Sequence, residues 1–299
     1  MSSESHEVVI TDDPAEFLAL AGEHLAADPV LTTVVSTVTH RALAQVERGL
    51  PAPDHPRWWA VVRDASGGVV GVAMRTAPFA PYPLFVLPMP DDAAVALARA
   101  VHARGEETGG ANGALPATQV LAEEAARLQG LAARAWEHTR LFELGELVEP
   151  KLVEGRMRPA GADDTELCLA WFQAFAADAA EQAGRTDGEG HEEYFTREDM
   201  LERIEGGRIW LWGVAGETVH LTGFNPPAFG VARVGPVYTP RELRGRGYAS
   251  AGVAEVSRWL RDQGARVCLF TDQANPTSNR IYQALGYRAV VDMANLRVG

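Results

Sequence analysis

The chain has 299 residues, enough for two domains, and its 46% hydrophobic residues can fill sizeable cores. Its formal net charge of −13 argues against nucleic acid as a partner, because phosphate binding needs a clustered basic surface. No stretch is long and apolar enough to span a membrane, and Met1 to Glu7 lacks the basic and apolar regions of a signal peptide, so we expect a cytoplasmic protein.

Residues 1–150 are predicted to form one α/β domain. Asp13-Pro14 is typical of a helix start, with Asp as N-cap and Pro at the first helical position, and Asp28-Pro29 repeats this signal. Two strand-like runs flank the turn 65–68 and predict a hairpin. The expected elements are helices over 14–26, 28–48, 91–103 and 117–135, and strands over 58–63, 69–73, 84–87 and 141–148.

Residues 151–299 are predicted to form a second domain. A D-x-x-E box at Asp163 to Glu166 precedes an apolar helical stripe, and Thr196 is the expected cap of a short helix after the polar loop 184–190. Gly264 fits the position that follows a helix. The expected elements are helices beginning near 163 and over 196–205, 248–262 and 275–285, and strands over 209–214, 218–224, 231–238, 266–271 and 287–291.

The two halves share one order of elements: two helices, a hairpin, another strand, a helix and a strand. This order favours an internal duplication, although few residues are identical between the halves. The alternative is that the halves are two unrelated α/β units.

The strongest chemical signal is a glycine-rich turn between a strand and a helix. Main-chain N–H groups at a helix N-terminus lack partners and carry the positive end of the helix dipole, so they attract phosphates. Gly245 and Gly247 allow the backbone to approach a phosphate closely, and Arg244 and Arg246 add positive charge. Taken alone, this turn is also compatible with a dinucleotide fingerprint or a plain tight turn.

A second segment begins where a buried strand ends. Asn275 is the expected N-cap and Pro276 the first residue of a helix. Asn279 and Tyr282 lie three residues apart and therefore share a face of that helix. The helix thus presents an amide and a phenol near the end of the strand.

Together these segments resemble the GNAT superfamily of acyl-CoA N-acyltransferases. The family's pyrophosphate motif, Arg/Gln-x-x-Gly-x-Gly/Ala, is matched by the run from Arg244 to Ala249. The family's later helix is matched by Asn275, Asn279 and Tyr282, followed by Gly286-Tyr287. The resemblance is specific over residues 231–291.

The resemblance implies a mixed, mostly antiparallel α/β sheet in which strands 231–238 and 266–271 run parallel and splay apart, flanked by helices, in two tandem GNAT-like domains. It implies that acetyl-CoA is the co-substrate and that its pantetheine arm enters the splay. The residues implied to contact CoA are Val237, Tyr238, Thr239, Arg244, Gly245, Arg246, Gly247, Tyr248, Ala249, Ser250, Asn275, Asn279 and Tyr282.

The implied reaction is direct attack of an amine on the thioester, with no acyl-enzyme. Tyr282 and Asn279 are the predicted catalytic residues, with Tyr282 as the general acid that protonates the leaving thiolate, and Tyr238 is the alternative acid. The base is left open among His191, Glu192, Glu193, His220 and Asp272, or a chain of waters.

No metal site is expected. Cys168 and Cys268 lie in apolar runs and are expected to be buried thiols. The run from His191 to Tyr194 is not the H-E-x-x-H pattern of metalloproteases.

The first half departs from the family pattern, because Pro88 to Ala94 contains no Gly-x-Gly loop. We therefore expect residues 1–150 to be a degenerate copy that does not bind CoA, and residues 151–299 to be the catalytic domain. Two alternatives remain: a non-catalytic module that binds or senses acetyl-CoA, and a dinucleotide-binding oxidoreductase in which Asp272 contacts a ribose. The acidic net charge is read as favouring solubility, with attraction of a cationic amine as the alternative. The acceptor, a small-molecule or peptide amine, is expected to be cationic if the acidic loop 184–194 lines its site. Neither its identity nor the choice between monomer and homodimer is determined.

Overall fold

The computed structural model describes residues 6–182 and 195–299, so the predicted loop 184–190 lies outside the described residues. The chain divides into two compact units. Unit 1 consists of residues 1–140 together with 291–299, and unit 2 of residues 141–290. The boundary between the units therefore lies after residue 140 and not after the expected 150, and the last nine residues belong to the first unit.

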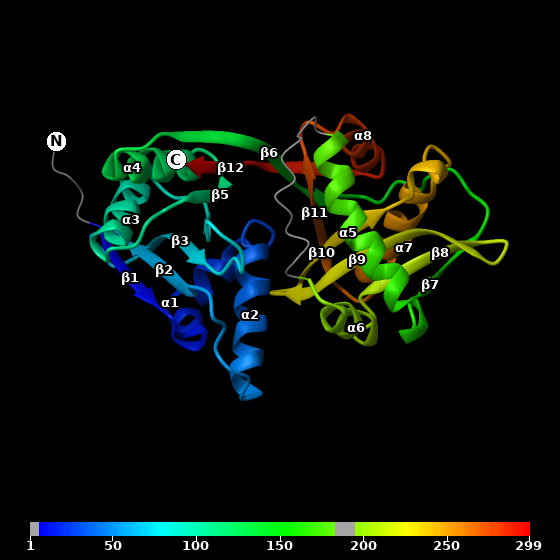
Figure 1. The fold of residues 1–299 in the computed structure, drawn as a ribbon, viewed down its shortest axis with the longest axis horizontal. Coiled ribbons are helices and arrows are strands. Elements are labelled where there is room, and N and C mark those ends of the chain that lie inside the picture. The colour runs from blue at the N-terminus through cyan, green and yellow to red at the C-terminus, as the bar shows by residue number, and fades with distance from the viewer. Residues whose placement is uncertain (1–5, 183–194) are drawn as a thin grey trace. The chain divides into compact units, whose positions relative to one another are not determined.

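Unit 1 is an α/β unit in which the strands from β1 to β12 follow the order β1-β2-β3-β4-β5-β12, and β6 is the next neighbour of β12 (Figure 1). All pairs in it are antiparallel except the parallel pair β4 and β5. Its elements are β1 (Glu7–Thr11), α1 (Pro14–Ala27), α2 (Thr33–Glu47), β2 (Trp58–Arg63), β3 (Val69–Arg75), β4 (Leu84–Val86), α3 (Asp91–Ala103), β5 (Gly110–Ala114), α4 (Ala117–Gln129), most of β6 (Ala133–Leu144) and the end of β12 (Tyr287–Val298).

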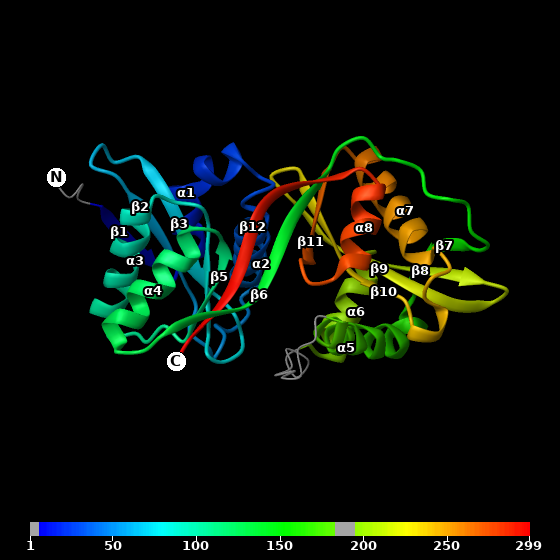
Figure 2. The same ribbon diagram turned by 90° about the horizontal axis from the view of Figure 1, so that it is seen from above.

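Both faces of the unit 1 sheet are covered by helices, and β2 shows why. Successive side chains of a strand point to opposite faces. Trp59 and Val61 accordingly pack in a cluster with α1 and α2, whereas Trp58, Ala60 and Val62 pack in another with α3 and α4. Figure 2 shows these two helix pairs on opposite sides of the strands. A strand buried on both faces reads as a continuous apolar run, as β2 does.

Unit 2 has a sheet with the strand order β6-β11-β10-β9-β8-β7. Here too one pair, β10 and β11, is parallel. Its elements are the end of β6, β7 (Arg156–Pro159), α5 (Thr165–Gln182), α6 (Arg197–Glu205), β8 (Ile209–Val214), β9 (Glu217–Ala228), β10 (Val231–Tyr238), α7 (Tyr248–Asp262), β11 (Arg266–Asp272), α8 (Pro276–Ala284) and the start of β12.

The helices of unit 2 also form two layers. Figure 2 shows α7 and α8 on one side of the strands and α5 and α6 on the other. Val253 and Val256 of α7 pack with Val234 and Leu269 in one cluster, and Met200 of α6 packs with β8 in another. This two-layer cover brings the start of α7 and the start of α8 to the ends of β10 and β11.

The predicted tandem arrangement is confirmed by the order of elements. Each unit contains, in sequence, a strand, two helices, three strands, a helix, a strand, a helix and a strand. The parallel pair falls at the same place in both series, between the third and fourth sheet strands after the helix pair. The doubly wound parallel sheet that a dinucleotide-binding enzyme requires is not formed by the described strands, because β9 and β10 are antiparallel.

Most predicted elements form, and the differences lie at their ends. Asp13 caps α1, accepting from the Ala15 N–H at 2.8 Å, but α2 begins at Thr33 because Asp28 ends α1. The helix expected over 117–135 stops at Gln129, where Gly130 is left-handed. Strand β6 starts at Ala133 and ends at Leu144 instead of covering 141–148, and β12 continues to Val298.

Three strands were not predicted, namely β1, β5 and β7, and α5 starts at Thr165 after a 3₁₀ turn. Strand β5 reads Gly-Ala-Asn-Gly-Ala, which has little intrinsic strand preference. It forms because it pairs on both sides, with β4 and with β12. Pairing partners from elsewhere in the chain, rather than local preference, thus determine this strand.

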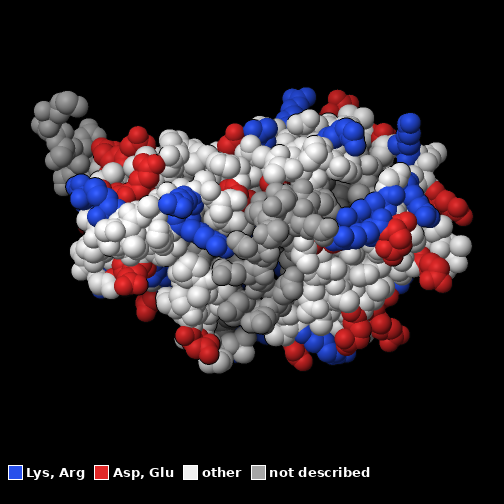
Figure 3. All heavy atoms as spheres, turned by 45° about the horizontal axis from the view of Figure 1, so that its top comes forward, with Lys and Arg blue, Asp and Glu red and all other residues white. Residues whose placement is uncertain are grey.

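The surface carries charges of both signs. On the face drawn in Figure 3, acidic and basic side chains of the described residues are interspersed. Among the described helices, none combines the length and the low polarity that crossing a bilayer would require.

The end of β12 is needed for the core of unit 1, which gives a test. Leu296 is 4% exposed and packs in the cluster beneath α3 and α4. We expect Leu296→Ala to lower the free energy of unfolding by about 2–5 kcal/mol, since it removes buried methyl groups and leaves a cavity. Val290→Ala, at an exposed position on the same strand, should change it by less than about 0.5 kcal/mol. Urea titration followed by circular dichroism measures both, and equal effects would contradict this role.

Candidate active site

The parallel strands β10 and β11 pair over only part of their length. Their register runs from Val231 opposite Arg266 to Val234 opposite Leu269. Beyond that point β10 continues to Tyr238 and β11 to Asp272 without further paired residues. The register of β10 against β9 also shifts between Val234 and Val237. The predicted splayed pair is therefore present.

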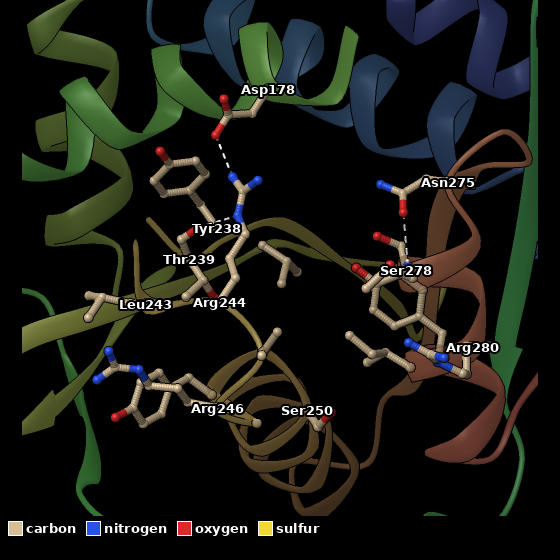
Figure 4. Close-up of a pocket in the computed structure, with 18 of the residues that line it drawn as sticks. Asp178, Tyr238, Thr239, Leu243, Arg244, Arg246, Ser250, Asn275, Ser278 and Arg280 are labelled. Carbon is tan, nitrogen blue, oxygen red and sulfur yellow. Dashed lines mark hydrogen bonds and ion pairs between the residues drawn. The ribbon is translucent and has the colours of Figure 1, made fainter. Parts of the chain in front are cut away.

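A cavity of about 330 Å³ opens where the two strands separate. Residues of β10, the glycine-rich turn, α7, α8 and α5 form its walls (Figure 4). Of the residues predicted to contact CoA, those that line it are Val237, Tyr238, Thr239, Arg244, Gly245, Arg246, Gly247, Tyr248, Ala249, Ser250, Asn275 and Tyr282. Walls that the sequence did not indicate include Phe175, Asp178, Leu243, Thr277, Ser278, Arg280 and Ile281.

The turn has the backbone geometry that was expected of an anion-binding loop. Gly245 and Gly247 have φ of +76° and +89°, a left-handed region that favours glycine. Helix α7 begins directly at Tyr248, so the main-chain N–H groups of its first turn lack acceptors within the helix. The residues of that turn line the cavity. A Cβ on Gly247 would also lie 2.9 Å from Val153 Cγ1, so a side chain there would require Val153 to shift.

Arg244 does not extend toward the first turn of α7. Figure 4 shows its side chain directed toward Asp178 of α5, and Nη2 of Arg244 bonds Oδ2 of Asp178. Its Nε donates to the Thr239 carbonyl oxygen at 3.0 Å, and Arg241 Nε donates to Asp178 Oδ1 at 2.8 Å. The guanidinium predicted to hold a pyrophosphate is thus paired with a carboxylate, and Arg246, which also lines the cavity, extends in another direction.

Asp178 is the central acid of this wall. Burial alone raises its pKa, but the hydrogen bonds and charges of Arg241 and Arg244 outweigh burial and hold the pKa below its usual value. The side chain therefore stays ionised. The sequence contained a signal for Asp178. Trp171, Phe175 and Asp178 have the spacing of one helix face, so this acid lies on a face that is otherwise apolar. A carboxylate buried on such a face requires a charged or hydrogen-bonding partner.

Two tyrosines, Tyr238 and Tyr282, line the cavity, and the pKa of each is raised. Burial first, and the charge of Asp178 second, raise the pKa of Tyr238. Burial raises the pKa of Tyr282 to about 12, and its side chain is 8% exposed. Tyr282 packs edge-on against Tyr287, with ring centroids 6.1 Å apart. Its hydroxyl therefore keeps its proton at neutral pH.

The amides of α8 have structural partners. Asn275 caps the helix, since its Oδ1 accepts from the Ser278 N–H at 3.1 Å. Asn279 is not among the residues that line the cavity. Its Nδ2 donates to the carbonyl oxygens of Asp272, at 2.9 Å, and Asn275, at 2.7 Å. These bonds fasten the start of α8 to the end of β11, and the catalytic role of Asn279 stays a prediction.

The structure argues against two of the candidates for the general base, His220 and Asp272. His220 is fully buried, burial lowers its pKa to about 3, and both ring nitrogens are hydrogen-bonded to threonine hydroxyls. Asp272 does not line the cavity, and its Oδ1 accepts from the Ala274 N–H at 2.8 Å. Residues 191–193 lie outside the described residues. Cys168 and Cys268 are buried and form no disulfide with each other, as expected.

The corresponding place in unit 1 is closed. Strand β4 pairs with β5 over its whole length, from Leu84 opposite Ala111 to Val86 opposite Gly113. Gly113 approaches β4 so closely that a Cβ would lie 2.0 Å from the Val86 carbonyl oxygen. In addition, α3 begins with Asp91 and Asp92, so negative charges occupy the helix end that a phosphate would need.

Comparisons with known proteins agree with this geometry. The family model described as FR47-like protein matches residues 228–298. Curated protein sequences give no match. A GNAT-family acetyltransferase from Colwellia psychrerythraea has a TM-score of 0.57 at 11% identity and covers 98% of both chains. A GCN5-related N-acetyltransferase from Sphaerobacter thermophilus has a TM-score of 0.61 at 18% identity, covering 97% of this chain and 95% of its own.

A third structure bears on the tandem arrangement. A tandem GNAT protein from the clavulanic acid biosynthesis pathway has a TM-score of 0.53 at 13% identity, and the match covers 99% of this chain and 98% of that one. At these identities the likeness establishes the fold. The chain has the tandem GNAT fold that its motifs resemble.

The pairing of Asp178 predicts a dependence of stability on pH. Because the pKa of the folded carboxyl lies below that of an unfolded one, about 3.9, the pairing stabilises the fold fully at neutral pH and is lost as the pH falls below about 4. We expect Asp178→Asn to lower the free energy of unfolding by about 1–3 kcal/mol at pH 7.

The same substitution should cost progressively less below about pH 4, where the wild-type carboxyl also becomes protonated. Thermal unfolding of both proteins between pH 3 and pH 7 measures this. Glu23→Gln, at an exposed site in the middle of α1, serves as the control. A pH-independent difference for Asp178→Asn would contradict an ionised, paired carboxylate.

Proposed function

We propose that this protein is an N-acetyltransferase that moves an acetyl group from acetyl-CoA to a primary amine by direct attack in a ternary complex. The observation that carries the proposal is that one cavity joins the phosphate-binding turn to a buried, protonated tyrosine, Tyr282, through the gap between β10 and β11. The GNAT-type fold supports acyl transfer in general.

The residues of the cavity fit acetyl-CoA. The first turn of α7 and the two left-handed glycines offer main-chain N–H groups to a diphosphate, and Arg246 adds the charge that Arg244 does not supply. The unpaired edge of β10 beyond Val234 offers backbone groups to the amide-containing pantetheine arm. The co-substrate brings an activated thioester, and the protein needs only to orient it.

The side chains support direct attack rather than an acyl-enzyme. Neither cysteine lines the cavity, and burial raises the pKa of Cys168 to about 12, so its thiol is not a nucleophile at neutral pH. The neutral acceptor amine attacks the thioester carbonyl carbon, the carbon–sulfur bond breaks, and the sulfur leaves with the electron pair. Tyr282 holds the proton that this sulfur takes up. The nitrogen, cationic after the attack, gives up one proton to solvent, and Tyr282 regains a proton from solvent after donating its own.

Tyr282 is favoured over Tyr238 as the general acid for an electrostatic reason. The charge of the ionised Asp178 raises the pKa of Tyr238, because loss of the phenol proton would place a phenolate near a carboxylate. Unit 2 is then the catalytic unit, and unit 1, whose strand pair is closed, does not bind the co-substrate. The acceptor is proposed only as an amine, and a cytoplasmic location remains an expectation from the sequence.

The alternative is a module of the same fold that binds or senses acetyl-CoA without turnover. The two functions share the cavity and differ in the use of Tyr282. A panel of amines, assayed for release of free thiol from acetyl-CoA, distinguishes them, because binding without thiol release from any amine would favour the sensing module.

Binding is tested by calorimetry with acetyl-CoA. We expect one site per chain, since unit 1 is closed, and loss of detectable binding in Gly247→Glu, because the new side chain would fill the turn and place a carboxylate where the phosphates lie. Gly22→Glu adds the same charge to α1, at a helical position where a Cβ has open space, and should bind as the wild type does. Binding to NAD instead of acetyl-CoA would reject the proposal.

Catalysis is tested with Tyr282→Phe. We expect kcat to fall by about 100-fold or more, while the affinity for acetyl-CoA stays within a few-fold of that of the wild type, because only proton donation is removed. Tyr287→Phe is the matched control, since its hydroxyl is equally buried, bonds Ser257 at 2.7 Å and lies outside the cavity lining. Unchanged kcat in Tyr282→Phe would show that another group donates the proton.

A further inference from the structure

His220 is a fully buried histidine of β9 that no part of the proposed reaction uses. Its Nδ1 lies 2.8 Å from Thr239 Oγ1 and its Nε2 lies 2.7 Å from Thr222 Oγ1. A neutral imidazole has one donor and one acceptor nitrogen, and each threonine hydroxyl can take the complementary part. Burial lowers the pKa of the ring to about 3, so it stays neutral at physiological pH.

One end of the phosphate-binding turn is held by this ring. Thr239 is the residue that follows β10, and it lines the cavity. Its hydroxyl bonds His220, and its carbonyl oxygen accepts from Arg244 Nε at 3.0 Å. The position of Thr239 therefore determines where the turn leaves the strand.

The other end of the turn rests on the same ring. Gly252 lies in the second turn of α7, and a Cβ there would be 2.5 Å from His220 Nε2 and 2.9 Å from Thr222 Oγ1. The missing side chain lets α7 approach β9 directly over the imidazole. A single buried side chain thus contacts the residue before the turn and the helix after it.

We propose that His220 is the positioning residue of the phosphate-binding turn, which it holds by bonding Thr239 on one side and supporting α7 at Gly252 on the other. The inference rests on the proposed function, because it assigns His220 to the binding of acetyl-CoA. Main-chain N–H groups must converge on a ligand to within about 0.5 Å, and a turn rich in glycine cannot maintain that by itself. The ring supplies the constraint without a charge that would repel or attract the phosphates.

The experiment measures the dissociation constant of acetyl-CoA by calorimetry and the unfolding temperature for each variant. His220→Phe keeps a planar ring of similar size and removes both hydrogen bonds. We expect its dissociation constant to rise about tenfold or more. Thr118→Val removes a buried threonine hydroxyl in unit 1, which bonds the Ala114 carbonyl oxygen at 2.8 Å, and should lower the unfolding temperature without changing the dissociation constant.

Two amide variants separate the two sides of the ring. The amide group of an asparagine lies about as far from the main chain as Nδ1 of histidine, so it can still bond Thr239. The amide group of a glutamine lies about as far out as Nε2 and bonds Thr222 instead. We expect His220→Asn to bind acetyl-CoA within about threefold of the wild type and His220→Gln to bind about tenfold more weakly. Both are amides, so this comparison stands even if His220→Phe does not fold.

A double-mutant cycle with Thr239→Val completes the test. If the imidazole acts through Thr239, the effect of Thr239→Val on the dissociation constant should largely disappear when His220→Phe is already present. Additive effects, or folded His220→Phe and His220→Gln variants with wild-type affinity, would overturn the inference. Failure of the wild type itself to bind acetyl-CoA would instead reject the proposed function.

Discussion

The separation of β10 from β11 after Val234 is the constraint on which the site depends. A sheet normally satisfies its backbone groups by pairing, so two neighbouring strands that part must leave N–H and C=O groups for another partner. Here the parting leaves a cavity of about 330 Å³, and the two helices that follow these strands both begin at it. Backbone donors, helix ends and Tyr282 therefore meet at a single place.

The two units show how small a difference opens or closes such a site. They share one order of elements and one parallel pair each. In unit 1, Gly113 lets β5 approach β4 until the pair is complete, and acidic residues occupy the start of the next helix. In unit 2, the strands part and a glycine turn precedes the helix. The shared order of elements and the shared place of the parallel pair favour duplication over two unrelated units.

Charge within the site is arranged differently from what the motif implies. Asp178 is paired with Arg241 and Arg244, the two arginines that precede the glycines of the turn. These two cations therefore stabilise the wall of the cavity. Under the proposed function, an anion would be held chiefly by main-chain N–H groups, whose directions depend on the backbone. This makes buried supports such as Asn279, which fastens α8 to β11, and His220 beneath the turn as important as the residues that face the cavity.

The sequence by itself determined the elements with strong local signals. The helices α3 and α7 and the strands β2 and β10 have the predicted bounds, because periodic apolar residues, glycines and prolines act locally. The sequence also indicated that the turn from Arg244 to Ser250 and the phenol of Tyr282 belong to one site. Tertiary structure alone decided the rest: β5 forms through its partners, Arg244 pairs with a helix 66 residues away, and Asn279 turns to the backbone. Such outcomes depend on which groups remain unsatisfied once distant segments pack, and no local pattern records that.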